Sequence, residues 1–134
     1  MAYIHGLAFD GHARGWSEDE FQTLLHDAQV FCVHQPNGFA LGRVTLTEGE
    51  LLTIATHPDH QGQGTGHQTL AAFLEELRRR GADSAFLEVA RDNHTAIALY
   101  TSAGFAELGC RKAYYHRRDG ARVDALILRR GITA

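Results

Sequence analysis

The sequence is most informative where it reads Gln61-Gly62-Gln63-Gly64-Thr65-Gly66. An apolar stretch, residues 51–56, precedes this run, and an amphipathic segment follows it. Glycines let a backbone turn sharply and bring its N–H groups close to a ligand. A helix start adds unpaired N–H donors and the positive end of the helix dipole. The run therefore predicts a strand, a phosphate-binding loop and then a helix.

The segment after the glycine run has the clearest helical pattern of the chain. Its apolar residues recur at i, i+3, i+4 and i+7 and are Leu70, Phe73, Leu74 and Leu77. This spacing predicts a helix over residues 66–80, which Gly81 ends. The basic run 78–80 suits the C-terminal end of a helix dipole better than a nucleic-acid patch.

The rest of the chain alternates between strand-like and helix-like patterns. We expect helices over 2–10, 17–26 and 93–103, the last ended by Gly104. We expect strands over 29–35, 39–47, 51–56, 85–90, 105–116 and 123–128, with turns at 36–38, 48–49 and 119–120. Helices that connect strands in this order indicate an α/β mixture, in the wider sense α+β, with crossovers between strands.

Composition limits the function classes. The 134 residues are 44% hydrophobic and 22% charged, with a formal net charge of −3, which fits one domain over residues 1–134 without a basic field for nucleic acid. We find no membrane-spanning run, so the sequence predicts a cytoplasmic protein. The two cysteines, Cys32 and Cys110, have no paired spacing and are expected to be small buried residues. The histidines lack metal-ligand spacing, so no metal is expected.

Three phosphate-binding motifs compete for the glycine run. A Walker loop needs a Gly-Lys-Ser/Thr ending, whereas Gly66 is followed by His67 and Gln68. A dinucleotide fingerprint needs a glycine where His67 stands, and an antiparallel meander is predicted before the run. The third motif, Gln-x-x-Gly-x-Gly, fits Gln61, Gly64 and Gly66.

This third motif resembles the acetyl-CoA loop of the GCN5-related N-acetyltransferases, the GNAT family. Other stretches similar to the family are 53–59, 87–93 and 96–105, and the tail 111–115 with 119–120 looks like its RimI branch. RimI-type enzymes acetylate the N-terminal amine of a ribosomal protein. The resemblance extends from about Ile4 to Leu128. It implies a GNAT fold, with a mixed central sheet of about six strands and helices on both faces, and this chain lacks a counterpart of the family's first strand.

The resemblance also implies which residues bind acetyl-CoA. The backbone of Ile54, Ala55 and Thr56 would face the pantetheine arm and the thioester. The pyrophosphate would bind at Gln61, Gly62, Gln63, Gly64, Thr65, Gly66 and His67. Gly62 and His67 stand where RimI relatives often carry arginine. Asn93 would contact the pantetheine arm, although its capping of the following helix explains this residue equally.

The same resemblance assigns the chemistry to two side chains. Glu88 would be the general base, acting directly or through water, and Tyr100 would protonate the leaving thiolate. Tyr114 and Tyr115 would line the entrance for the acceptor. From the residues alone, Glu88 also fits a solvated strand face, and the three tyrosines fit core or sheet-packing positions.

The expected reaction is therefore acetyl transfer to an amine. An α-amino group has a pKa of about 7.7–8.0 and a lysine amine about 10.4, so a single glutamate suits the first better. We expect a protein N-terminus as acceptor, such as that of a ribosomal protein, with neither nucleic acid nor membrane as partner. A small-molecule amine acetyltransferase and a non-catalytic acyl-CoA sensor stay open as alternatives, as do monomer and homodimer.

Overall fold

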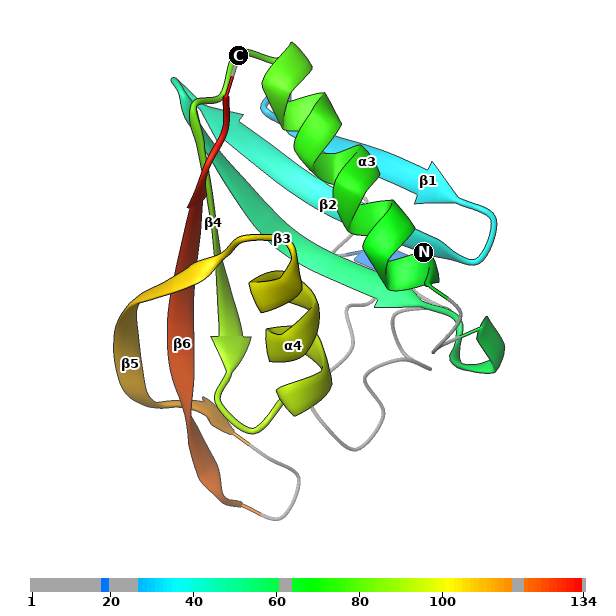
Figure 1. Cartoon of the computed structure of the whole chain (residues 1–134). Coiled ribbons are helices and arrows are strands. Elements are labelled where there is room, and N and C mark those ends of the chain that lie inside the picture. Colours follow the sequence, from blue (N-terminus) through cyan, green and yellow to red (C-terminus); the bar gives the residue numbers. More distant parts are fainter. Residues whose placement is uncertain (1–17, 20–26, 61–63, 117–119, 134) are drawn as a thin grey trace.

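A six-stranded mixed sheet forms the centre of the computed structural model, which describes residues 18–19, 27–60, 64–116 and 120–133. The strand order is β1-β2-β3-β4-β6-β5 (Figure 1). The strands are β1 (Val30–Gln35), β2 (Gly38–Thr45), β3 (Glu48–Thr56), β4 (Ser84–Ala90), β5 (Ala106–His116) and β6 (Arg122–Gly131). Strands β3 and β4 are parallel, and the other neighbours are antiparallel. The α/β interpretation, in the wider sense α+β, is confirmed.

Two helices cover one face of this sheet. Helix α3 (Thr65–Arg79) connects β3 to β4, and α4 (His94–Ser102) follows β4. A short 3₁₀ turn, η1 (Pro58–His60), lies between β3 and the glycine run. Figure 1 shows both helices in front of the sheet. The helices predicted over 2–10 and 17–26 lie outside the described residues, apart from Glu18 and Asp19, which are helical.

Much of the core lies between α3 and the strands β1, β2 and β3. The buried residues of α3 are Thr69, Leu70, Phe73 and Leu77. The ring of Phe73 stacks on that of Phe31 in β1, with centroids 5.7 Å apart. Gly42 lies beneath these two rings, since a Cβ added there would be 2.4 Å from Phe73 Cε1 and 2.7 Å from Phe31 Cζ. The amphipathic pattern that predicted the helix thus also predicted its buried face.

One predicted turn was wrong. The β2–β3 hairpin turns at Leu46 and Thr47, where Leu46 has a φ of 56° and is 92% exposed, whereas residues 48–49 belong to β3. Gly49 leaves room for the side chain of Leu77, because a Cβ at this position would lie 2.6 Å from Leu77 Cδ2. The sequence pattern could not separate these two uses of a glycine.

Glycines end both helices in the same way. Gly81 has a φ of 86°, and the Ala82 N–H donates to the Leu77 carbonyl at 3.0 Å. Gly104 has a φ of 95°, and the Phe105 N–H donates to the Tyr100 carbonyl at 3.0 Å. Both are Schellman ends, in which the residue after the glycine folds back on the last turn. The predicted helix ends are confirmed, because glycine adopts this left-handed conformation without strain.

The packing of Gly42 leads to a first prediction. Gly42→Ala should lower the free energy of unfolding by about 1–3 kcal/mol, because the new methyl must displace the stacked rings of Phe31 and Phe73. Gly109→Ala is the matched control, since a Cβ there meets Ile127 Cδ1 at an ordinary 3.8 Å. Urea unfolding of both variants checks this, and equal stabilities of the two would contradict the packing described.

Candidate active site

The candidate site begins where strands β3 and β4 separate. Their parallel pairing joins Glu48 to Ser84, Gly49 to Ala85 and Glu50 to Phe86, and no further pair follows within the described residues. Beyond it, β3 stays paired with β2 as far as Thr56, and β4 with β6 as far as Ala90. The two strands therefore diverge toward their carboxyl ends (Figure 1). Backbone groups that face each other across this opening lack a ladder partner and can hydrogen-bond a ligand.

The predicted backbone contacts lie on the β3 side of this opening. Ile54 and Ala55 are buried and Thr56 is half-buried. The pairing with β2 occupies one edge of this segment and leaves the edge toward β4. Gly38 allows β2 to approach closely, because a Cβ there would lie 2.8 Å from the Ala55 carbonyl oxygen.

The described part of the glycine run forms the start of α3. Gly64 is the N-cap with a φ of 83°, and Gln68 N–H donates to its carbonyl at 3.0 Å. The N–H groups of Thr65, Gly66 and His67 precede this first helical bond, so helix geometry gives them no acceptor. The first turn contains no acidic residue. It therefore offers N–H donors and a positive dipole end to an anion. Gln61, Gly62 and Gln63 lie outside the described residues.

Three elements meet at this helix start. A Cβ placed on Gly66 would lie 3.5 Å from Leu99 Cδ2 in α4 and 3.9 Å from Thr56 Oγ1 in β3. Gly66 of the glycine run, the end of β3 and α4, far apart in the sequence, therefore lie close together. The structure thus brings together the segments to which the resemblance assigned acetyl-CoA binding.

Two caps orient α4 and its tyrosine. The Asn93 side chain accepts a hydrogen bond from Ala96 N–H at 3.2 Å, so the predicted cap is confirmed. Its amide nitrogen carries two further donor hydrogens. At the other end, Phe105 packs edge-on against Tyr100, with ring centroids 6.0 Å apart. Tyr100 is 6% exposed and belongs to the core cluster that includes Ile54 and Val89. The ring therefore lies on the helix-covered face of the sheet.

Glu88 lies on the opposite face. Its neighbours Leu87 and Val89 belong to the core under the helices, and side chains alternate along a strand. The Glu88 carboxylate is 24% exposed and forms an ion pair with Arg111 of β5, with Nε–Oε1 at 3.2 Å. The two residues predicted to carry the chemistry thus approach the sheet from its two sides, near the opening between β3 and β4.

The cysteines differ from each other. Cys32 is half-buried, and burial raises the pKa of its thiol to about 11. Such a thiol is protonated and poorly nucleophilic at neutral pH. Cys110 is exposed and accepts a hydrogen bond from Arg91 Nη2 at 3.5 Å, so its prediction as a buried residue was wrong. Cys110 lies on β5, which is an edge strand of the sheet.

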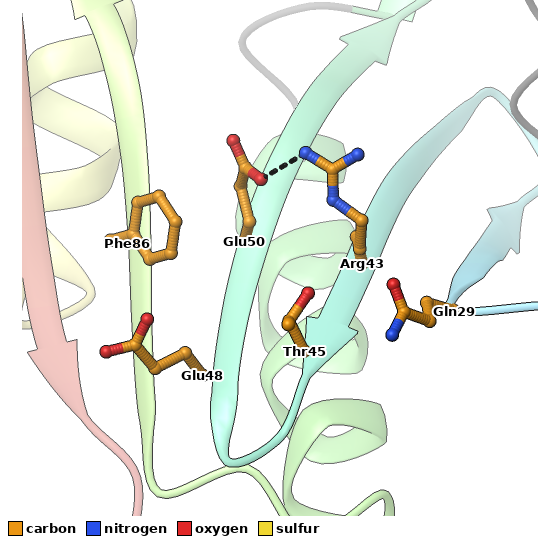
Figure 2. A pocket seen from close by; sticks show the side chains of 6 residues that line it. All are labelled: Gln29, Arg43, Thr45, Glu48, Glu50 and Phe86. Atoms are coloured by element: carbon orange, nitrogen blue, oxygen red, sulfur yellow. Dashed lines mark hydrogen bonds and ion pairs between the residues drawn. The ribbon is translucent and has the colours of Figure 1, made fainter. Parts of the chain in front are cut away.

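A pocket of about 300 Å³ lies apart from the glycine run. It is lined by Gln29, Arg43, Thr45, Glu48, Glu50 and Phe86, on the face that Figure 2 shows with the helices behind it. Arg43 Nη2 and Glu50 Oε1 are 2.7 Å apart across β2 and β3. These residues surround the paired ends of β3 and β4, at the other end of β3 from Thr56. The pocket is therefore not formed by the predicted site residues.

Some predictions fall beyond what the structure describes. The backbone of Tyr115 pairs with Val123 in the β5–β6 hairpin, whereas the side chains of Tyr114 and Tyr115 are outside the described residues. In the described ranges no group of three or more metal-ligating side chains occurs. No helix in that part of the chain is long and apolar enough to cross a membrane.

Sequence reasoning missed the partner of Glu88. Arg111 was read only as part of a family-like tail. Two irregularities in the β5–β6 pairing, between Glu107 and Gly109 and between Arg111 and Tyr115, shift the alternation of side chains. No local pattern reveals such shifts, so the face on which Arg111 lies could not be derived from the sequence.

The comparisons with known proteins agree with this geometry. Residues 3–105 match the acetyltransferase (GNAT) family. The [ribosomal protein bS18]-alanine N-acetyltransferase of Escherichia coli K12 is 40% identical over 121 residues, covering 87% of this chain and 81% of that protein. The crystal structure of the E. coli ribosomal-protein-S18-alanine N-acetyltransferase superposes with a TM-score of 0.86 and 36% identity, covering 99% of this chain and 86% of that one. The Salmonella typhimurium protein yncA, solved with its cofactor acetyl-CoA, shares the fold, with a TM-score of 0.76 at 20% identity over 98% of this chain and 85% of that one.

The Asn93 cap leads to a second prediction. Asn93→Ala should lower the free energy of unfolding by about 1 kcal/mol, because the first turn of α4 loses its side-chain acceptor. Asn93→Asp keeps an acceptor at a helix N-terminus and should stay close to the wild type. Thr95→Ala, an exposed change in the same turn, is the control. Urea unfolding of the three variants tests the cap, and an Asn93→Ala protein as stable as Thr95→Ala would refute it.

Proposed function

The chain belongs to the acetyltransferase (GNAT) family and is an N-acetyltransferase, and from this premise we propose that it acetylates the N-terminal α-amine of a protein. The observation that carries the proposal is the convergence of the α3 start, the end of β3 and α4 beside the opening that Glu88 borders. The similarity of the chain to the bS18-alanine N-acetyltransferase supports a ribosomal protein as the acceptor. Such an acceptor would place the enzyme in the cytoplasm. We further propose that residues 1–134 form a single GNAT domain.

Acetyl-CoA is the proposed acetyl donor. Its pyrophosphate would bind the free N–H groups at the start of α3 and the run 61–63 before it. The pantetheine arm would follow the unpaired edge of residues 54–56, and a backbone N–H there would polarise the thioester carbonyl. The donor hydrogens of the Asn93 side-chain amide are not used by its cap and would be available to the same arm. The residues present therefore suit a phosphorylated, amide-containing chain.

The reaction needs a base on one side and an acid on the other. The amine nitrogen attacks the thioester carbon, the C–S bond breaks, and the thiolate takes a proton. We assign Glu88 as the base that removes the proton from the amine and Tyr100 as the donor to the thiolate. Ordinary pKa values of about 10 for tyrosine and 8.5 for a thiol oppose this last transfer by roughly 2 kcal/mol. Tyr100 would therefore donate as the C–S bond breaks, or the thiolate would be made more basic by its own desolvation.

An α-amine suits this arrangement better than a lysine. About a tenth or more of an α-amino group is neutral at pH 7, whereas only some four in ten thousand lysine side chains are. We infer that Tyr114 and Tyr115, on the hairpin beside the opening, contact the acceptor peptide.

A peptide panel tests the acceptor. Hexapeptides with free N-termini, including ones that begin with alanine, should release free CoA thiol from acetyl-CoA. The same peptides with blocked N-termini but a free lysine should give less than about a hundredth of that rate, because the lysine amine is almost fully protonated. Polyamines and aminoglycosides are the comparison for a small-molecule enzyme, and turnover with these alone would exclude the proposal. Binding of acetyl-CoA without any turnover would instead indicate a sensor.

Removing the Tyr100 hydroxyl tests the acid. Tyr100→Phe should lower kcat roughly 100-fold under chemistry-limited conditions and leave the KM for acetyl-CoA nearly unchanged, because the thiolate loses its proton donor. Tyr115→Phe removes the same atom from a proposed acceptor-binding residue and should act mainly on the KM for the peptide. A Tyr100→Phe enzyme with wild-type single-turnover rates would remove this role from Tyr100.

A further inference from the structure

Arg111 reaches Glu88 across a whole strand. Glu88 on β4 is opposite Ile127 of β6, and Arg111 on β5 is opposite Ala125 of the same strand. The arginine therefore spans β6 to bring its Nε to 3.2 Å from Glu88 Oε1. Ala125 shares this face and is fully buried, and its single methyl leaves room for the arginine stem to lie over it. The pair is held by the register of three strands.

Among the described residues, Arg111 is the cation that contacts Glu88, and the other nearby arginines lie elsewhere. Arg129 is opposite Phe86, one diagonal step from Glu88, and Arg43 is paired with Glu50. Arg91 lies near Asp124 and Cys110 at the end of β4, with its Nε 3.4 Å from Asp124 Oδ2. Within the described residues, the ion pair of Glu88 is therefore with Arg111.

We propose that Arg111 is a positioning residue, which holds the Glu88 carboxylate in the orientation that takes a proton from the acceptor amine. This inference rests on the proposed role of Glu88 as the base. A glutamate that is 24% exposed has room to change rotamer, and its side chain has three rotatable bonds. The planar guanidinium, with its Nε 3.2 Å from Glu88 Oε1, restricts this freedom. A general base depends strongly on such placement.

The role is expected to be visible in catalysis more than in stability. Arg111 is 53% exposed, and ion pairs at this exposure contribute little to folding. We expect Arg111→Gln to lower kcat about 10-fold at an unchanged KM for acetyl-CoA, because the base loses its orientation. Arg111→Lys keeps the charge and should recover kcat to within about 3-fold of the wild type. The thermal midpoints of both variants should stay close to that of the wild type.

A double-mutant cycle separates positioning from an independent role. If Arg111 acts through Glu88, then Arg111→Gln should change kcat less than about 2-fold in a Glu88→Gln background, where no carboxylate remains to be oriented. Single-turnover acetyl transfer measures all four proteins. The same fold-loss in both backgrounds would overturn the proposal, because Arg111 would then act independently of Glu88. An unchanged kcat for Arg111→Gln in the wild-type background would overturn it as well.

Arg43→Gln is the matched control. It breaks an ion pair of 2.7 Å on the same face, between side chains that are 34% and 27% exposed, but away from the opening between β3 and β4. We expect its kcat to stay within about 2-fold of the wild type. A loss equal to that of Arg111→Gln would show a general effect of charge on this face and overturn the proposal.

A failure of the proposed function gives a different pattern. If the acceptor is a small amine, the wild type acetylates that amine. The double-mutant cycle is then run in the same way, with that amine as the acceptor. If Glu88→Gln turns over like the wild type, the base assignment falls, and the role of Arg111 falls with it. If Glu88→Gln is slow and the cycle is additive, the base assignment stands and the role of Arg111 alone is refuted.

Discussion

The short parallel pairing between β3 and β4 is the constraint on which the site depends. Three residue pairs, ending at Glu50 and Phe86, join the two strands, and β2 and β6 then hold them apart. A sheet that stayed fully paired would satisfy its own backbone groups and offer none to a ligand. Because pairing stops in mid-sheet, the ends of β3 and β4 keep backbone groups for the proposed contacts with the pantetheine arm.

The two faces of this opening differ in character. On one face, α3 and α4 cover the sheet and bury Tyr100 among apolar side chains. On the other, Glu88 and Arg111 are partly exposed and charged. An apolar environment makes a leaving thiolate more basic, and a partly exposed charged environment suits the carboxylate that takes the proton of the amine. Because side chains alternate along β4, Glu88 lies on the face opposite α4 and Tyr100, and the proposed base and acid are on different sides of the sheet.

Local signals gave most of the elements and one error that is informative. The apolar spacing from Leu70 to Leu77 predicted α3 to within a residue, and Gly81 and Gly104 predicted both helix ends. These signals are strong because helix periodicity and a positive φ leave little choice of residue. The turn predicted at Gly49 was wrong, because a sequence does not distinguish a glycine that leaves room for a packed leucine from a glycine in a turn. The extension of β6 to Gly131 was also missed, since its pairing with Ser84 is a distant contact.

The sequence by itself determined the kind of ligand and the kind of chemistry. Glycines before an amphipathic helix indicated phosphate binding, and the resemblance of the flanking motifs to the GNAT family implied acetyl transfer with Glu88, Asn93 and Tyr100 as candidates. The tertiary structure decided how the elements that carry them meet: that β3 and β4 part, that Leu99 and Thr56 close around Gly66, and that Arg111 reaches Glu88. Motifs depend on neighbouring residues, which a sequence displays directly. Strand register and irregular pairing depend on contacts between distant segments, which appear only when the sheet has formed.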